Sequence, residues 1–355
     1  MNQWLKILSI DGGGARGLIP VRLLEEIEKQ CQCLSGKEQR IHELFDVIAG
    51  TSTGGVVSLM LTKPKPLTCA EVKHLYSEHA KDFFFATVWH RLKTIGGWLG
   101  PKYPTSSAKH ALQDVLGTDT ELKDAVGEVV IPIYDITKKH CPDPSRHPGP
   151  RTFSRTDANN DPQQNFRMWE VALAATSAPT YFPCVPIANK DVQLHPIDGA
   201  VYLNNPAGAG ISHAMRIKYP AAYAKLVRNE ELDNAVSRPE GILVLSLGTG
   251  WHERAIVVQR AAHWGKLRWA SPLFDVMIEA QAEAADMILR PIPGIKFVRL
   301  QPILKENVKL DDVSPRAQTT MLQACDRCLA DKEADIKFVC DKICGKQSAP
   351  AARST

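Results

Sequence analysis

A serine flanked by glycines is the feature of the sequence that points most directly to chemistry. Gly50, Ser52 and Gly54 form the pattern G-x-S-x-G between a strand-like apolar run, residues 44–49, and a helical pattern, residues 54–61. A sharp strand-to-helix turn needs small neighbours, and it presents the serine oxygen at a helix N-terminus, whose dipole favours developing negative charge. A glycine- and threonine-rich turn that merely caps a helix is the alternative. The preceding strand favours Ser52 as a nucleophile on an elbow formed with Gly50 and Gly54.

A glycine-rich segment, DGGGARG at residues 11–17, also lies between a strand-like run and a helical pattern. Consecutive glycines allow backbone N–H groups to converge on one point, and Arg16 would add positive charge beside it. Such a loop can stabilise the oxyanion of an acyl-transfer reaction. The loop needs a nucleophile and the elbow needs an oxyanion hole, so the two motifs explain each other.

The same segment satisfies G-x-G-x-x-G, the fingerprint of NAD(P)-binding oxidoreductases, at Gly12, Gly14 and Gly17. The acidic residues that could bind a ribose lie closer to the glycines than the usual distance of about 20 residues, inside the predicted first helix. They are Glu25, Glu26 and Glu28. A dinucleotide site also leaves Ser52 unexplained, so the oxidoreductase is kept as an alternative. A catalytically idle interaction protein is a second alternative, against which the intact motifs argue.

Strand-like and helical segments alternate from the first residues. Residues 4–10 and 44–49 are strand-like, whereas residues 20–31 and 54–61 are helical, and further strand-like runs follow at 129–134, 242–247 and 297–300. This order predicts an α/β fold with a mostly parallel sheet covered by helices.

Residues 141–164 are rich in Pro, Asp and Asn and predict a long exposed loop. The motifs lie on both sides of this loop, so we expect one domain from residue 4 to residue 345 and a disordered tail at residues 346–355.

Asp198 begins a third short motif, D-G-A at residues 198–200, followed by N-N-P at residues 204–206. Asp-Gly by itself is a turn signal. Together with residues 11–17 and 50–54, however, these strings resemble, in the same order, the three signature blocks of the patatin-like phospholipase family. Residues 174–183 and 245–250 match as well, so the resemblance extends from about residue 5 to residue 310. Residues 44–55 and 297–313 are also similar to the calcium-independent phospholipases A2 of this family.

The resemblance implies a three-layer α/β/α sandwich and a Ser-Asp dyad without histidine. Ser52 would be the nucleophile and Asp198 the base, and the expected reaction is hydrolysis of fatty-acyl esters of membrane phospholipid or other lipids through an acyl-enzyme, with no metal or cofactor. The oxyanion would be held by the backbone amides of Gly12, Gly13 and Gly14, with Arg16 nearby. Ala200 stands where many relatives have a second glycine.

The biological role stays open at this point. Bacterial members of the family include housekeeping lipases, secreted toxins and antiphage effectors switched on by cyclic nucleotides. The resemblance therefore leaves open a membrane-degrading role, an activating cyclic nucleotide and a homo-oligomer, although nothing in the sequence identifies a nucleotide pocket. It also leaves open the acyl position and the headgroup.

Composition narrows the class of protein. Of 355 residues, 44% are hydrophobic and 23% charged, and the net charge of +4 comes without a long basic run, which gives no support for a nucleic-acid polymer as partner. No apolar stretch is long enough for a membrane span, and the first ten residues lack the features of a secretory signal. The nine cysteines, an odd number, favour a reducing compartment. We expect a cytoplasmic protein that is peripheral at a membrane when active.

Two alternatives concern histidine and cysteine. Ser52, Asp198 and His213 occur in the order of an α/β-hydrolase triad, which one of 11 histidines can match by accident. A cysteine cluster loosely resembles a zinc site. Its members are Cys325, Cys328, Cys340 and Cys344. Because these cysteines fall among apolar residues at spacings of three and four, we favour buried helix positions.

Two segments mix aromatic and basic residues and are candidates for an interfacial surface, with ordinary core positions as the alternative. The first contains Phe83, Phe84, Phe85, Trp89, Arg91, Lys93, Trp98, Lys102 and Tyr103. The second contains Trp251, Arg254, Arg260, Trp264, Lys266, Arg268 and Trp269.

Overall fold

Parallel strands occupy the centre of the molecule. The computed structural model describes residues 4–79, 101–137, 148–232, 236–252 and 265–345. Five strands lie parallel in the order β3-β2-β1-β8-β9, and β4 and β7 pair antiparallel with β3. The strands are β1 (Leu5–Ile10), β2 (Val47–Gly50), β3 (Val129–Asp135), β4 (Gly149–Ser154), β7 (Pro196–Asp198), β8 (Ile242–Leu247) and β9 (Ile295–Leu300). The mostly parallel sheet expected from the alternating pattern is confirmed.

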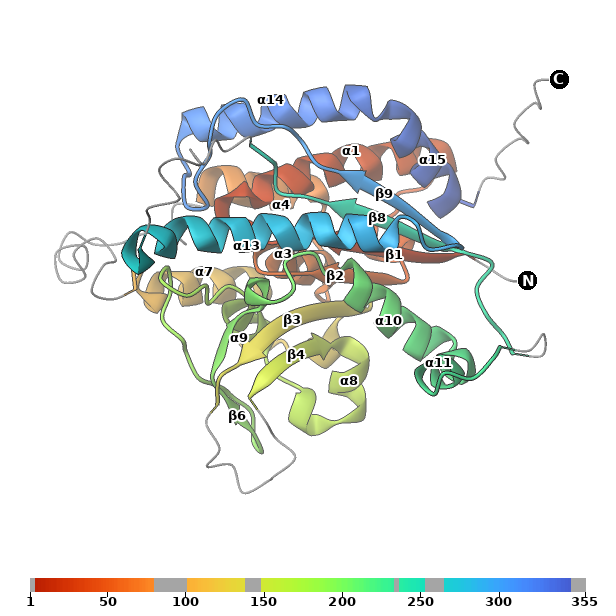
Figure 1. Cartoon of the computed structure of the whole chain (residues 1–355), viewed down its shortest axis with the longest axis horizontal. Helices are drawn as coiled ribbons and strands as arrows, with labels where there is room; N and C mark the ends of the chain where they lie inside the picture. Colours follow the sequence, from red (N-terminus) through yellow and green to blue (C-terminus); the bar gives the residue numbers. More distant parts are fainter. Residues whose placement is uncertain (1–3, 80–100, 138–147, 233–235, 253–264, 346–355) are drawn as a thin grey trace.

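Alternate residues of the strands face two separate cores. Leu8 and Ile10 of β1 point into the larger core, whereas Leu5 and Ile7 point into the smaller one. The larger core is covered by α1 (Leu18–Ser35), α3 (Thr53–Thr62), α4 (Cys69–His74), α7 (Thr105–Leu116), α9 (Met168–Ala175), α14 (Pro315–Asp331) and α15 (Glu333–Ile343). The smaller core is covered by α10 (Ala207–Lys218), α11 (Pro220–Val227) and the end of α13 (Lys266–Leu289). The three layers of an α/β/α sandwich follow, with α1, α14 and α15 together on one side of the sheet (Figure 1).

The second strand begins later than predicted. Leu44 ends the short helix α2 (Ile41–Leu44), which starts with a capping box in which the Arg40 amide donates to the Glu43 carboxylate over 2.7 Å. The apolar run of residues 44–49 therefore crosses a helix end before β2 starts at Val47. Apolar periodicity alone could not separate the two elements.

The predicted loop at residues 141–164 is wrong from residue 149 onward. That part forms β4, α8 (Arg155–Asn160) and a 3₁₀ turn, Pro162–Gln164, whereas residues 141–147 lie outside the described residues. β4 is anchored by Phe153, which packs edge-to-face on Phe166 at 5.3 Å between ring centroids. Ser154 caps α8 by accepting from the Asp157 amide over 3.0 Å. Pairing with β3 and the burial of Phe153 thus form a strand in a segment whose composition predicts a loop.

Three of the four clustered cysteines occupy the buried helix positions favoured from their spacing, whereas Cys344 is half-buried at the C-terminal cap of α15. Cys325, Cys328 and Cys340 are buried on α14 and α15, and the Sγ of Cys325 donates to the backbone oxygen of Ile19 over 3.7 Å. Within the described ranges, His, Cys, Asp and Glu form no group of three or more suited to a metal ion. Nor does any described helix combine the length and the apolar character that a bilayer-spanning segment needs.

Most of the two aromatic and basic segments lies outside the described residues. Of the first segment, Tyr103 is only 5% exposed and donates to Asp311 over 2.8 Å, and Lys102 pairs with the same carboxylate. Tyr103 therefore belongs to the interior and not to an interfacial surface. Trp251 of the second segment is half-buried. The tail predicted at residues 346–355 is likewise outside the described residues.

Candidate active site

Ser52 occupies a strained turn between β2 and α3. Its backbone has φ 53° and ψ −122°, a conformation that residues other than glycine rarely adopt and that costs about 1–3 kcal/mol. The flanking glycines make the turn possible. A Cβ on Gly50 would lie 2.2 Å from the backbone oxygen of Gly54, and a Cβ on Gly54 would lie 2.3 Å from that of Ile10. The predicted elbow is therefore present, with Ser52 at the N-terminus of a helix.

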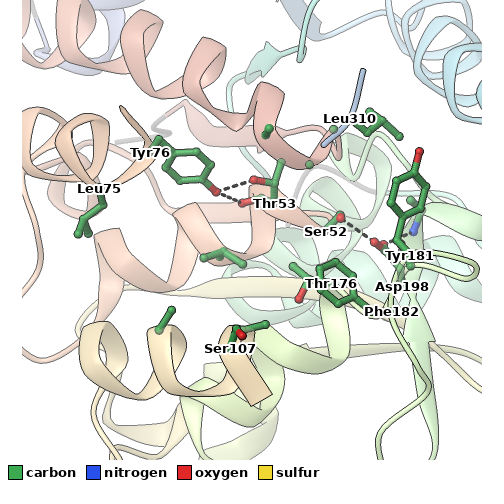
Figure 2. A pocket seen from close by; sticks show the side chains of 18 of the residues that line it. Ser52, Thr53, Leu75, Tyr76, Ser107, Thr176, Tyr181, Phe182, Asp198 and Leu310 are labelled. Carbon is green, nitrogen blue, oxygen red and sulfur yellow. Dashed lines mark hydrogen bonds between the residues drawn. The ribbon is translucent and has the colours of Figure 1, made fainter. Parts of the chain in front are cut away.

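Asp198 lies directly opposite Ser52. The hydroxyl of Ser52 donates to Oδ2 of Asp198 over 2.6 Å, although the two residues are 146 positions apart (Figure 2). β7 brings the aspartate there, since Asp198 pairs with Ile133 of β3 and its amide donates to the backbone oxygen of Ser177 over 3.1 Å. The amide of Ala200 donates to the other oxygen, Oδ1, over 2.9 Å. Both oxygens of the carboxylate thus have a fixed donor.

Burial changes the acidity of this carboxyl group. Asp198 is 2% exposed and Ser52 8% exposed. Removal from water disfavours the charged form and raises the pKa of Asp198 to about 7, although the hydrogen bonds from Ser52 and Ala200 partly offset the rise. A carboxylate with a pKa near neutrality is a much stronger proton acceptor than one in water.

The glycine loop lies against Ser52, but its amides differ in availability. The amide of Gly12 donates to the backbone oxygen of Asn204 over 3.2 Å, so this predicted oxyanion donor is already engaged. Gly13 and Gly14 line the cavity beside Ser52, and no residue in the described part of the chain accepts from either amide. Of the three amides predicted, two are available to a ligand.

Arg16 is buried next to the loop without lining the cavity. The residue lies in the 3₁₀ turn Gly14–Gly17 and is 4% exposed, but it is absent from the described cavity wall. Arg16 is therefore not placed to contact a substrate oxygen in this cavity, contrary to its expected position near the oxyanion. A different arginine supports the loop, since Arg299 donates to Asp11 over 2.6 Å.

Thr53 is a donor that the sequence motifs do not single out. It is the first residue of α3 and lines the cavity, and within the described part of the chain no residue accepts from its amide. The residue after the nucleophile commonly supplies an oxyanion donor in serine hydrolases with this kind of turn, so its position next to Ser52 was the available signal. Tyr76 holds the residue in place, with its hydroxyl 2.5 Å from Oγ1 of Thr53 (Figure 2).

A cavity of about 630 Å³ opens at Ser52. Its walls come mainly from α3, α7 and the segment around Phe182, and most of the lining side chains are apolar. They include Val56, Met60, Leu75, Ala108, Ala111, Val115, Phe182, Ile278 and Leu310. Ser52 and Asp198 place polar atoms in the wall of this mostly apolar space, an arrangement suited to a ligand with a long apolar chain and a reactive polar group.

His213 lies elsewhere, on α10. Its Nε2 is 2.7 Å from a carboxylate oxygen of Glu128, and its Nδ1 is 3.0 Å from a guanidinium nitrogen of Arg216. Both ring nitrogens therefore have partners other than Ser52 and Asp198. The geometry gives the triad alternative no support.

The dinucleotide alternative also lacks support. A Cβ on Gly12 would lie 3.1 Å from the Cβ of Ser52, so the loop is packed against the serine turn. Glu25 pairs with Lys73, and Glu28 accepts from the Cys69 amide over 3.1 Å. These two proposed ribose partners are engaged with α4 instead.

Comparison with known proteins agrees with the motifs. A family model described as patatin-like phospholipase matches residues 8–211. Patatin-like protein 2 of Oryza sativa subsp. indica is 34% identical over 322 residues, covering 84% of this chain and 74% of the relative. Patatin-like protein 2 of Arabidopsis thaliana is 34% identical over 312 residues, covering 81% and 71%. VipD from Legionella pneumophila, a solved structure, aligns with a TM-score of 0.39 at 13% identity over 93% of this chain and 67% of its own. The family match and the two plant relatives show that this chain belongs to the patatin-like phospholipase family.

Proposed function

We propose that this protein hydrolyses fatty-acyl esters of lipids with Ser52 as nucleophile and Asp198 as general base. Membership of the patatin-like phospholipase family supports lipid acyl hydrolase activity in general. The observation that carries the specific assignment is the 2.6 Å hydrogen bond from Ser52 to a buried aspartate in the wall of a mostly apolar cavity. This bond is short enough for direct proton transfer, without an intervening histidine.

In the acylation step, Asp198 takes the proton of Ser52 while Oγ attacks the ester carbonyl. The resulting oxyanion would accept hydrogen bonds from the amides of Gly13, Gly14 and Thr53. As the carbonyl re-forms, the bond to the alcohol breaks, and the proton on Asp198 passes to the leaving alkoxide. The products of this step are an acyl-Ser52 ester and a free alcohol.

Deacylation repeats the sequence with water. Asp198, again ionised, accepts a proton from a water molecule that attacks the acyl-Ser52 carbonyl. The tetrahedral intermediate expels Oγ of Ser52, which recovers its proton from Asp198. A fatty acid leaves and the resting hydrogen bond re-forms. One aspartate thus alternates between base and acid, which a pKa near neutrality favours in both directions.

The pH profile should report the ionisation of Asp198. Only the ionised carboxylate can accept the proton of Ser52, so kcat/KM on a short soluble ester should rise through about pH 7 and level off above it. Below the pKa the rate should fall about tenfold per pH unit. The profile can be recorded from initial rates in buffers of constant ionic strength. A rate independent of pH between about pH 5 and pH 8 would contradict the role of Asp198.

A fluorophosphonate probe tests the proposed nucleophile, because it reacts covalently with activated serines. We expect stoichiometric labelling of the wild-type protein on the peptide that contains Ser52, and release of fatty acid from phospholipid vesicles by the unlabelled protein. Ser212→Ala, an exposed serine on α10, is the matched control and should label normally. Labelling that persists in Ser52→Ala, or vesicles left intact by the wild type, would refute the proposal.

Peripheral contact with a membrane is part of this proposal, since phospholipid substrates reside in bilayers. Support comes from α13, whose outward face carries exposed apolar side chains at helical spacing while Ile278 on its inward side lines the cavity. The exposed residues are Leu273, Val276, Met277, Met287 and Ile288. Activation by a cyclic nucleotide, a homo-oligomer and a cytoplasmic location remain predictions from the resemblance and the composition.

A further inference from the structure

Gln281 is a polar residue outside the three motifs, and it makes two hydrogen bonds to the active-site loop that follows Asp198. It lies on α13, which crosses in front of the sheet in the view of Figure 1. Its Oε1 accepts from the amide of Asn204 over 2.8 Å, and its Nε2 donates to the backbone oxygen of Ala200 over 3.1 Å. A backbone amide can only donate and a carbonyl can only accept, so these two partners dictate the orientation of the Gln281 side chain.

One of the two partners of Gln281, Ala200, is hydrogen-bonded to the proposed base. Ala200, whose oxygen binds Gln281, also donates its amide to Oδ1 of Asp198 over 2.9 Å. Asp198 in turn accepts from Ser52 through Oδ2. A continuous path of hydrogen bonds and one short turn, Gly199–Val201, therefore connects Gln281 with the nucleophile.

The other partner of Gln281, Asn204, is hydrogen-bonded to the glycine loop. Asn204, whose amide binds Gln281, accepts from the amide of Gly12 through its backbone oxygen over 3.2 Å. The side chain of Asn204 adds a second link to α13, because its Nδ2 donates to the backbone oxygen of Ile278 over 3.3 Å. Gly12 immediately precedes Gly13 and Gly14, whose amides remain available. Gln281 thus contacts the segment that follows the proposed base, and Asn204 links this segment to the glycine loop.

Other points of this loop are held by the sheet and the serine turn. Thr51 donates to the backbone oxygen of Leu203 over 2.8 Å, and the side chain of Asn205 bonds to Ser9 and Ser246. None of these bonds is made to the oxygen of Ala200 or to the amide of Asn204. β7 is only three residues long and ends at Asp198, so Ala200 and Asn204 lie beyond the last strand pairing. Without Gln281, the oxygen of Ala200 and the amide of Asn204 would each lose a hydrogen-bond partner at a buried residue. The two ends of the stretch from Ala200 to Asn204 would then be held less firmly relative to Ser52.

We propose that Gln281 is a positioning residue for the reaction, which keeps Asp198 and the glycine loop in register on either side of Ser52. The inference rests on the proposed function and extends it to α13. A displacement of about 1 Å between reacting groups can cost about 100-fold in rate, because proton transfer and oxyanion binding both require close alignment. Gln281 acts through Ala200 and Asn204 and does not itself touch the reacting atoms.

Gln281→Leu tests this role, since leucine has a similar volume and cannot form either hydrogen bond. We expect kcat on a short soluble ester to fall about 10- to 100-fold, with KM changed less than about threefold. The acid limb of the kcat/KM profile should also move to higher pH, because the Ala200 amide, which lowers the pKa of Asp198, is held less firmly. Rates are expressed per active site titrated with the fluorophosphonate, which removes any contribution from unfolded protein.

Two further variants sharpen the test. Gln281→Glu keeps an acceptor for Asn204 but replaces the donor to Ala200 with a negative charge, so its acid limb should move at least as far as that of Gln281→Leu. Glu283→Gln, an exposed residue on the same helix, should behave as the wild type. Wild-type kcat and an unmoved acid limb in Gln281→Leu would overturn the inference, as would a lower melting temperature with unchanged kinetics per titrated site. Failure of the wild type to hydrolyse any ester would instead overturn the proposed function, and this inference with it.

Discussion

Ser52→Ala is expected to lower kcat for ester hydrolysis by about 10⁶-fold, the size of the effect when a serine hydrolase loses its nucleophile. Without Oγ no acyl-enzyme can form, and the remaining groups can only assist direct attack by water. The elbow itself should survive, since the strained backbone is imposed by the close packing of Gly50 and Gly54 and not by the hydroxyl. Steady-state kinetics and circular dichroism of the purified variant would measure both consequences.

The result is informative only if the variant still binds lipid. We therefore expect KM, or the dissociation constant of a non-cleavable ether lipid, to change little in Ser52→Ala, because the cavity walls are untouched. A loss of activity of less than about tenfold would show that another group is the nucleophile, since removal of the true nucleophile leaves only binding and oxyanion effects.

Asp198→Asn is expected to lower kcat by about 10⁴-fold while leaving the fold intact. Asparagine can keep both contacts in a changed sense, accepting from Ala200 and donating to the oxygen of Ser52, but it cannot take a proton. Ester hydrolysis and the rate of fluorophosphonate labelling should both fall, since each depends on an activated Ser52. A similar loss in both assays would place the defect before deacylation.

The same substitution should change the pH dependence of stability. The folded-state pKa of Asp198, about 7, is raised above its ordinary value, so this group contributes stability that is fully present only below the ordinary pKa and is lost as the pH rises through about 7. The neutral amide of an asparagine would carry no such penalty. Asp198→Asn should therefore raise the melting temperature more at about pH 8 than at about pH 4.

His213→Ala is the control for the role of the aspartate. Because both ring nitrogens of His213 contact Glu128 and Arg216, its removal should leave kcat per folded molecule within about threefold of the wild type. If His213→Ala were inactive and Asp198→Asn active, a histidine base would replace the dyad. Stability should be monitored in parallel, since Glu128 loses a buried partner.

The sequence predicted the serine turn well because the turn is a local feature. A strand followed by glycine, serine and glycine leaves the backbone few options, and the close contacts at Gly50 and Gly54 are made within a few residues or with the neighbouring strand β1. Most strands were predictable for the same reason, since apolar runs such as 242–247 mark buried parallel strands. The strand and helix within residues 149–164 were not predicted, because the polar composition of this segment indicates a loop. The burial of Phe153, which opposes that indication, depends on residues far away in the sequence.

The position of Asp198 next to Ser52 depends on tertiary contacts and not on local sequence features. The sequence alone offered a turn signal and a family resemblance at this residue, and only the pairing of β7 with β3 brought its carboxylate to 2.6 Å from Ser52.

The availability of the candidate oxyanion donors was likewise decided by tertiary contacts. Three consecutive glycines look equivalent in the sequence, but Asn204 engages Gly12 and leaves Gly13 and Gly14 available, while Arg16 is buried away from the cavity.

Ser52, a nucleophile candidate from the sequence alone, thus acquires its surroundings from segments far along the chain. The proposed base comes from β7, the contact to the glycine loop from Asn204, and the hydrogen bonds of Gln281 from α13. The physical reason is the range of the interactions involved. Backbone sterics act between neighbouring residues and can therefore be predicted from short motifs. Hydrogen-bond partners and burial depend instead on how distant strands and helices pack. The sequence by itself determined where the candidate nucleophile lies, and the tertiary structure decided which groups can act on it.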